Sequence, residues 1–404
     1  MNSYKHFATV SSQVYFCSSP IRLDSYNRCQ FGCTYCFSRN RSLDTSIPGL
    51  KIANPEAFGD RLSRVARGTI QSAFDEFLAS RVPIQLGGMQ DPFSGLEVKH
   101  RTTLELLKIL HRHNYPTIIS TKSVLIVEEP YASLLKAMNV LVRFSAAGVQ
   151  EECRRKLEVG CPEISEMLAA VKFLSKQGTA ISLRIQPVIP GHERAALRLA
   201  RRGARAGAKH ISFEYLKIGT EGKEQTIKRV SDAIGADVWS AMERQGIVRV
   251  GRDYTLKATA KSDFIKRAKQ LCKQARVKFG AGDTEFIHLS DGTGCCNGSE
   301  YFLQGSTQFR SNFVGILSNR RKGDKIYFSD LEQHWQPQRN VHRYLTTDSR
   351  GRSSNKKLSS WMSLLARRWN GGKSPYSPSF FFGIRWSGKL DNRGYKIYEV
   401  EDIF

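Results

Sequence analysis

The first two thirds of the chain alternate short β-rich runs with helix-like stretches, and this alternation limits the available folds more than any other feature. The runs that predict strands are 20–25, 83–88, 116–122, 140–146, 180–189 and 210–216. Helical periodicity fills the gaps, as in 162–178, where apolar residues share one face between Pro162 and Gly178. Repeated strand–helix units predict an α/β fold with a parallel sheet, either doubly wound or curled as a barrel.

Composition narrows the class of protein. The 404 residues, 40% of them hydrophobic, are enough for a sizeable core. No apolar run approaches the roughly 18 residues of a membrane helix, and the first residues lack a signal-peptide pattern. We therefore expect a cytoplasmic protein with no membrane contact, in which cysteines serve more often as ligands or reactive thiols than as disulfides. The formal net charge of +25 favours an anionic partner, with nucleic acid first.

The composition changes near residue 300. Residues 301–404 hold 18 Lys and Arg against 8 Asp and Glu, and they contain four of the five tryptophans, Trp335, Trp361, Trp369 and Trp386. We expect a first domain over 1–300 and a basic, aromatic-rich C-terminal segment over 301–404. Basic residues suit phosphates, and exposed aromatics suit unpaired bases. Burial is the usual fate of tryptophan, however, so the favoured interpretation is that these aromatics form the core of a small capping domain that closes the barrel mouth.

The most specific motif is a cysteine triplet with C-x3-C-x2-C spacing, Cys29, Cys33 and Cys36, directly after the first expected strand. Three thiolates on one short loop can hold a soft metal centre. A [4Fe–4S] cube held by three cysteines keeps one iron open to another ligand. A structural zinc site, which normally has a fourth ligand, and a metal-free thiol cluster are the alternatives.

The triplet, with Tyr35 just before its last cysteine, resembles the signature of the radical S-adenosylmethionine (SAM) enzymes. Further segments are similar to the spore-photoproduct-lyase-like branch, whose members are often labelled DNA repair photolyases: GGMQDPF at 87–93, STKS at 120–123, RRKLEVGCPEISEML at 154–168 and RIQPVIPG at 184–191. The resemblance covers roughly residues 14–300. It implies a partial (β/α)6 TIM-like barrel, a [4Fe–4S] cluster on the three cysteines, and SAM on the open iron.

The resemblance also implies roles for residues at the carboxyl ends of the expected strands, where the sites of such barrels gather. Gly87 and Gly88 would meet the amino end of SAM through backbone atoms. Lys122 and Ser145 would be polar SAM contacts, and the turn at Pro190 would flank the adenine. The complete expected cofactor-binding set is Tyr35, Gly87, Gly88, Asp91, Lys122, Ser145 and Pro190.

One position departs from the family pattern. Spore photoproduct lyase uses a cysteine thiol as hydrogen donor in the loop before an aspartate that corresponds to Asp91, and Gly88 takes that place here. Cys295 and Cys296, on a glycine-punctuated loop past the barrel, are candidates for a thiol hydrogen donor, a redox pair or ligands to a second metal. Their alternative is burial in a turn. Cys153, which follows the fourth strand, is a third catalytic candidate if it faces the mouth of the site.

Two arginine patterns carry further expectations. Arg184 lies within the fifth strand, and a buried arginine needs a partner such as Glu214. The arginines spaced along 194–205 are typical of a solvated helix face.

We therefore expect an enzyme that reductively cleaves SAM to a 5′-deoxyadenosyl radical and abstracts hydrogen from a nucleic acid, in repair or modification. An electron donor such as flavodoxin or ferredoxin would be its redox partner. The same chemistry on a protein or small anionic substrate is one alternative, and charge would then gather near the pocket. A noncatalytic, zinc-bearing nucleic-acid-binding protein is the alternative from another class.

Overall fold

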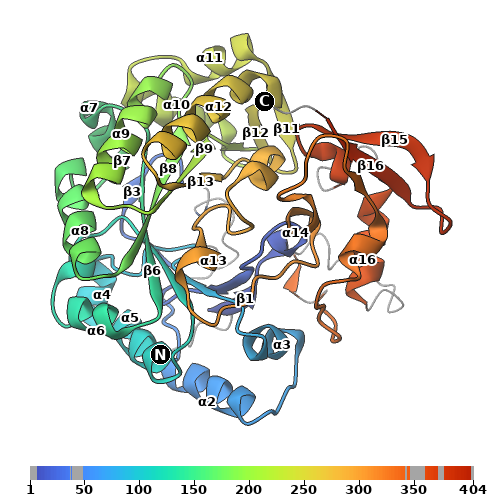
Figure 1. Cartoon of the computed structure of the whole chain (residues 1–404). Helices are drawn as coiled ribbons and strands as arrows, with labels where there is room; N and C mark the ends of the chain where they lie inside the picture. The colour runs from blue at the N-terminus through green and yellow to red at the C-terminus, as the bar shows by residue number, and fades with distance from the viewer. Residues whose placement is uncertain are drawn as a thin grey trace.

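The computed structural model describes residues 7–36, 38, 49–341, 344–345, 360–371 and 377–401. Its centre is an eight-stranded sheet in the order β1-β2-β4-β5-β6-β8-β9-β13 (Figure 1). The strands are β1 (Ala8–Val10), β2 (Ile21–Leu23), β4 (Ile84–Leu86), β5 (Thr117–Thr121), β6 (Val140–Ala146), β8 (Ala180–Val188), β9 (His210–Tyr215) and β13 (Lys278–Ala281). Only β1 runs antiparallel to its neighbour, and β1 and β13 are the open edges, so the barrel is partial.

All six predicted strands are confirmed, as β2, β4, β5, β6, β8 and β9. The α/β class and the partial barrel are confirmed with them. The structure adds β1 and a seventh parallel strand, β13, which pairs with β9 from Lys278 opposite His210 onward. β13 was missed because its sequence, KFGA, contains lysine, glycine and alanine, which are depleted in strands.

Helices surround the sheet on its outer side (Figure 1). They are α2 (Pro55–Ala66), α3 (Ala73–Ala79), α4 (Gly95–His100), α5 (Thr102–Arg112), α6 (Tyr131–Ala137), α7 (Glu151–Leu157), α8 (Ile164–Lys176), α9 (Glu193–Ala206), α10 (Lys223–Ile234), α11 (Val238–Gln245) and α12 (Ala258–Gln274). The helix expected at 162–178 is α8, which buries Ile164, Val171 and Leu174. α9 lies close to the sheet because its inner face is small: a Cβ on Gly203 would collide with Leu183.

Side chains on the inner face of the strands form successive layers. Ile118 on β5 and Leu141 on β6 pack with Leu303, which follows α13 (Ser299–Phe302), so this segment closes the amino-terminal end of the barrel. Since residues two apart on a strand share a face and rise about 7 Å, Ser120 and Arg143 form the next layer. One layer further, at the carboxyl edge, come Lys122 and Ser145.

Smaller sheets lie around the barrel. β3 (Gly32–Cys33) pairs with β7 (Glu158–Val159), and β12 (Asp253–Leu256) lies between β10 (Ile218–Gly219) and β11 (Ile247–Val250). In the C-terminal segment β16 (Lys396–Val400) lies between β14 (Lys325–Ile326) and β15 (Ile384–Leu390).

Two of the C-terminal tryptophans belong to the core. Trp361 and Trp369 are the first and last residues of α16 (Trp361–Trp369), and both are fully buried. Trp361 stacks on Tyr15 with ring centroids 5.3 Å apart, and its Nε1 donates to the Ser311 carbonyl at 2.6 Å. Base stacking is therefore wrong for these two residues, because no face of either ring is free. Trp335 and Trp386 are exposed.

The C-terminal segment also shares one continuous apolar core with the barrel through residues such as Phe309, Phe313 and Trp361. The division near residue 300 stays a prediction. Among the described residues, none of the helices combines the length and the apolar character that a membrane crossing needs.

Candidate active site

The cysteine triplet is positioned by the pairing of β3 with β7. In this antiparallel pair Cys33 lies opposite Glu158, and Gly32 lies opposite Val159. A Cβ on Gly32 would lie only 3.0 Å from the Val159 Cβ, so a larger residue would push the two strands apart. The pairing therefore fixes the middle cysteine of the triplet beside a buried carboxylate.

Glu158 accepts hydrogen bonds from several elements at once. Its Oε1 accepts from Lys122 Nζ at 2.6 Å and also from the Tyr35 hydroxyl. Its Oε2 accepts from Arg154 Nη1 at 2.9 Å. Lys122 Nζ also donates to the Ser145 carbonyl at 3.1 Å, and its distance to Ser145 Oγ is 3.5 Å. These five residues, Tyr35, Lys122, Ser145, Arg154 and Glu158, are called the Glu158 network below.

Electrostatics keep the Glu158 network charged. Burial alone would raise the pKa of Glu158, but Lys122, Tyr35 and Arg154 outweigh burial and hold that pKa below its usual range. Burial would lower the pKa of Lys122, yet the Glu158 carboxylate raises it. Lys122 is therefore a cation beside the cysteine loop, suited to an anionic group such as a carboxylate.

The three thiols of the triplet have different surroundings. The pKa of the Cys33 thiol is lowered, first by a hydrogen bond with the Cys161 thiol and then, against the effect of burial, by Lys122. Burial, with nearby Asp91, raises the pKa of Cys29 to about 12. Cys36 Sγ lies 3.0 Å from Ser38 Oγ. All three are free thiols.

The donor set fits an iron–sulfur cube, since three soft thiol ligands lie on one short loop. Within the described part of the chain, no three His, Cys, Asp or Glu side chains already form a group that could hold a metal ion. Binding a cluster therefore requires the triplet thiols to turn away from their present partners, Cys161 among them. The proximity of Cys161 was missed because it depends on the two-residue β3–β7 pairing, which has no sequence periodicity.

Asp91 acts on Lys122 through the backbone. Its Oδ2 accepts from the Lys122 backbone N at 2.6 Å, and its Oδ1 accepts from Thr121 Oγ1 at 2.8 Å and Phe93 N at 3.0 Å. Burial raises the pKa of Asp91. The carboxyl group thus connects the loop after β4 to the end of β5. From there the side chain of Lys122 extends to Glu158.

The remaining expected cofactor residues lie at the same carboxyl edge. Gly87 has a φ of +83°, and a Cβ there would be 2.6 Å from both Pro92 Cδ and the Ser120 carbonyl. Gly88 lies over the Arg22 side chain, whose Cδ would be 3.1 Å from an added Cβ. Pro190 is buried in the turn between β8 and α9. The structure thus joins Lys122 directly to Ser145 and, through Glu158, to Tyr35, and it places Gly87, Gly88 and Pro190 just after the carboxyl ends of β4 and β8.

Cys295 and Cys296 lie inside the barrel, one layer below Lys122 and Ser145. Arg143 Nη1 is 3.0 Å from Cys296 Sγ, and Arg143 Nη2 donates to Ser120 Oγ at 2.6 Å. The backbone of this loop also lies against β13, because a Cβ on Gly280 would collide with the Cys295 carbonyl. We call Cys17, Cys295, Cys296, Arg143 and Arg184 the thiol–arginine cluster.

The three thiols of this cluster have different pKa values because their surroundings differ. The pKa of Cys296 is lowered well below its ordinary value by a hydrogen bond with Cys295 and, against burial, by Arg143 and Arg184. The same hydrogen bond and burial raise the pKa of Cys295. Burial and the charge of Cys296 raise the pKa of Cys17 to about 11. Cys296 is thus the thiolate of the group, and Cys295 keeps its proton.

The expected pairing of Arg184 is confirmed. Arg184 Nη2 forms an ion pair with Glu214 Oε2, and Lys217 Nζ lies 2.6 Å from the other carboxylate oxygen. Arg143 differs, because none of the described residues supplies a carboxylate in ion-pair contact with it. The buried Nε groups of Arg143 and Arg184 and the Nε2 of His210 also have no hydrogen-bond partner among the described residues.

Cys153, and two polar residues that precede the Cys295 loop, have surroundings of their own. Cys153 is on α7, half-buried against the apolar core. The Nε2 of His288 lies 3.0 Å from the Phe382 carbonyl, and Asp291 accepts from the Phe279 backbone, so both have structural partners. A second metal on Cys295 and Cys296 finds no three-ligand group among the described residues.

Comparison with solved structures shows a shared fold. Spore photoproduct lyase complexed with dinucleoside spore photoproduct superposes with a TM-score of 0.51 and 15% identity, covering 70% of this chain and 80% of that chain. A single-residue variant of the same lyase superposes with a TM-score of 0.52 and 14% identity, with the same coverage. No protein-family model matches the chain, and no curated protein does. The fold implied by the sequence resemblance is thus confirmed.

Proposed function

We propose that this chain is a radical SAM enzyme whose substrate is a nucleic acid. The observation that carries the proposal is the position of the cysteine triplet: on the fold of spore photoproduct lyase, Cys33 lies beside the Glu158 network at the carboxyl edge of the sheet. Neither a zinc module nor a merely basic protein accounts for a lysine, a tyrosine and a serine gathered next to three free thiols.

In this proposal Cys29, Cys33 and Cys36 would hold a [4Fe–4S] cluster whose open iron would bind SAM. These groups would supply an electron and a carbon–sulfur bond whose cleavage gives a 5′-deoxyadenosyl radical. The charged Lys122 would pair with the SAM carboxylate and Ser145 would offer a hydroxyl, while Gly87 and Gly88 would allow close backbone approach. Tyr35 and Asp91 would position Lys122, and Pro190 would flank the adenine.

The nucleic acid substrate is supported by the net charge of +25 and by the shared fold, since the lyase it resembles was solved with a dinucleoside spore photoproduct. The enzyme would repair or modify a nucleotide in the cytoplasm. Flavodoxin or ferredoxin would be its electron donor. A small anionic substrate is the second candidate. The observation that favours it is the buried, carboxylate-free Arg143 with its unpartnered Nε–H inside the barrel.

The hydrogen donor that Gly88 cannot supply is proposed to be Cys295. Burial and a hydrogen bond with Cys296 raise the pKa of its thiol, and it adjoins Cys296, which lies beside Arg143 in the layer below Lys122 and Ser145. The step breaks the S–H bond, forms a C–H bond on the substrate radical, and leaves a thiyl radical on Cys295. Cys296, as the thiolate beside Arg143, positions the Cys295 proton through their hydrogen bond. The catalytic role of Cys153 stays a prediction.

The test uses anaerobically reconstituted protein, dithionite, SAM and an oligonucleotide deuterated at its sugar and base carbons. We expect deuterium in the 5′-deoxyadenosine that forms. Cys33→Ala should abolish 5′-deoxyadenosine formation, whereas Cys272→Ala, on α12 away from the site, should retain it. Transfer of deuterium from neither DNA nor RNA, with SAM cleavage intact, would overturn the nucleic acid substrate and leave the small anionic one.

A further inference from the structure

Charge gathers on the outer wall of the barrel along α9 and α12. The exposed cations of these helices are Arg194, Arg198, Arg201, Arg202, Arg205, Lys266, Arg267 and Lys273. We call this set the α9–α12 basic face. The five arginines recur at helical spacing on one side of α9, opposite the buried alanines and leucines that pack on the sheet.

A solvated helix face normally carries both signs of charge, but this one does not. α9 has a single acidic residue, Glu193, and α12 has only Asp263. Among the described residues, no ion pair joins any of the five α9 arginines to a carboxylate. Elsewhere on the surface, exposed cations do find partners, as Lys228 does with Asp232 and Arg155 with Glu163. The five α9 arginines thus form a row of exposed cations without ion pairs to described carboxylates.

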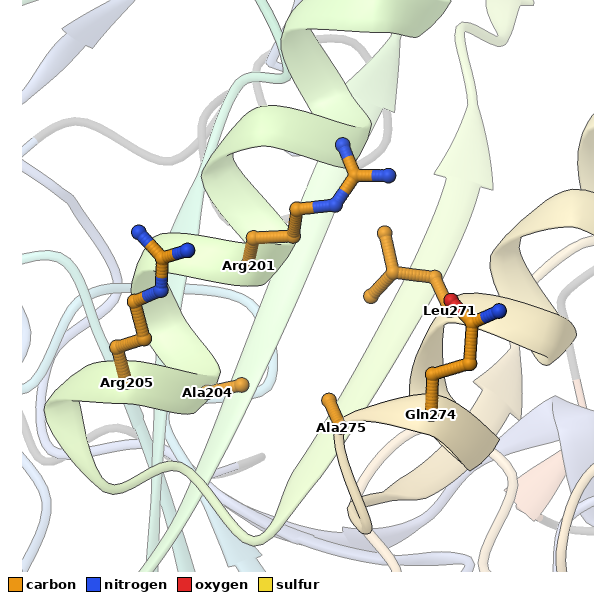
Figure 2. A pocket seen from close by; sticks show the side chains of 6 residues that line it. All are labelled: Arg201, Ala204, Arg205, Leu271, Gln274 and Ala275. Carbon is orange, nitrogen blue, oxygen red and sulfur yellow. The ribbon is translucent and has the colours of Figure 1, made fainter.

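The face is also hollowed. A depression of about 310 Å³ lies between the two helices, lined by Arg201, Ala204, Arg205, Leu271, Gln274 and Ala275. Figure 2 shows Arg201 and Arg205 on α9 across from Leu271 and Gln274 on α12. Two guanidinium groups at the rim and an amide on the facing helix can all donate to phosphate oxygens, and the guanidinium fork matches that geometry.

We propose that the α9–α12 basic face binds the sugar–phosphate backbone of a nucleic acid and holds the polymer along the barrel wall. From Arg194 to Arg205 the stripe spans about 17 Å, which corresponds to roughly five nucleotide steps of one strand. Binding there is independent of base identity, because all its donors suit phosphates and the depression offers no aromatic ring for stacking. The inference deepens the substrate class of the proposed function, but it requires neither cluster nor SAM.

The test compares two triple variants that lose the same charge. Arg201→Gln, Arg202→Gln and Arg205→Gln remove the centre of the α9–α12 basic face. Lys99→Gln, Arg112→Gln and Lys136→Gln, on the exposed sides of α4, α5 and α6, are the matched control. Binding of fluorescent 20-nucleotide DNA and RNA is measured by anisotropy from 50 to 300 mM KCl, and unfolding by urea verifies that both variants fold.

We expect the α9 triple variant to bind at least tenfold more weakly at 50 mM KCl. Its slope of log K against log salt should be shallower by about 2.1, or about 0.7 for each lost phosphate contact on a single strand. The control should keep the slope of the unmodified protein. Equal slopes in the two variants, or no binding of nucleic acid by the unmodified protein, would overturn the inference. Cleavage of SAM without nucleic acid should be unchanged in both variants, so a failure here is distinguishable from a failure of the radical SAM proposal.

Discussion

Glu158 is the residue on which the candidate site depends most. It is 1% exposed and neutralises Lys122 and Arg154 from two different elements. The sequence indicated only that the run from Arg154 to Glu158 belongs to a segment similar to the spore-photoproduct-lyase-like branch. The contact with Lys122 depends on a pairing of two-residue strands that no local pattern encodes. The pairing of Arg184 with Glu214 was predictable, because a charge within a buried strand requires a nearby partner.

Replacing Glu158 by Gln should destabilise the fold by about 3–5 kcal/mol, because it leaves the buried Lys122 without its counter-charge, although Arg154 keeps its ion pair with Glu151. The free energy of unfolding in urea measures this loss. Glu105→Gln, which breaks the exposed Glu105–Lys108 pair, is the control and should change little. A loss below 1 kcal/mol for Glu158→Gln would mean that the Glu158 network does not hold the site together.

The buried His210 should make the stability of the fold depend on pH. Burial, helped by the charges of Arg143 and Arg184, lowers its pKa to about 3. A histidine in the unfolded chain titrates near 6.5, so between about pH 6.5 and 3 the unfolded state binds more protons. Stability therefore falls as pH drops through this window, by about 2 kcal/mol for this group between pH 7 and pH 5.

Urea unfolding of the unmodified protein and of His210→Gln at pH 7, 6 and 5 tests this dependence. The loss of stability on acidification should be smaller in the variant by about 2 kcal/mol. The stability of the variant still falls on acidification, although less steeply, because burial also lowers the pKa of His288 to about 3. Identical pH profiles would show that His210 is protonated freely in the folded protein.

At the scale of elements, strands rich in bulky apolar residues were predictable, whether they are long, as β8 and β6 are, or have three residues, as β2 and β4 do. β13 and β3 contain glycine, which is depleted in strands, and their pairing with β9 and β7 defines them. The predicted site residues therefore lie at the ends of predicted strands, while the approach of the Cys295 loop to the barrel interior depended on β13.

Gly280 on β13 tests how tightly that loop is held. A Cβ there would collide with the Cys295 carbonyl and lie 2.7 Å from His210 Nε2. Gly280→Ala should destabilise the fold by about 1–3 kcal/mol, as overpacking does. The control is Gly59→Ala on α2, where the nearest atom is Ile109 Cδ1 at 3.5 Å, and a gain of about 0.5–1 kcal/mol is expected. Calorimetry that ranks the two variants in the opposite order would contradict the placement of the loop.

At the scale of the whole molecule, the aromatic residues of the C-terminal segment and the basic residues of α9 and α12 have different roles. The C-terminal segment places Trp361 and Trp369 in the shared core, so its aromatic content reflects packing. Composition could not distinguish this from base stacking, because both uses require aromatic residues beside cations. The exposed cations of α9 and α12 form one basic face, on helices whose arginine spacing was visible in the sequence but whose alignment required the fold.

The proposed activity depends above all on an iron–sulfur cluster with one open iron, held by the cysteine triplet. Iron and acid-labile sulfide, measured after anaerobic reconstitution, test it most directly. We predict about four of each per chain and a brown chromophore in the unmodified protein and in Cys272→Ser, with both lost in Cys33→Ser. A colourless protein without iron, or one that binds a single zinc ion and no sulfide, would contradict the account.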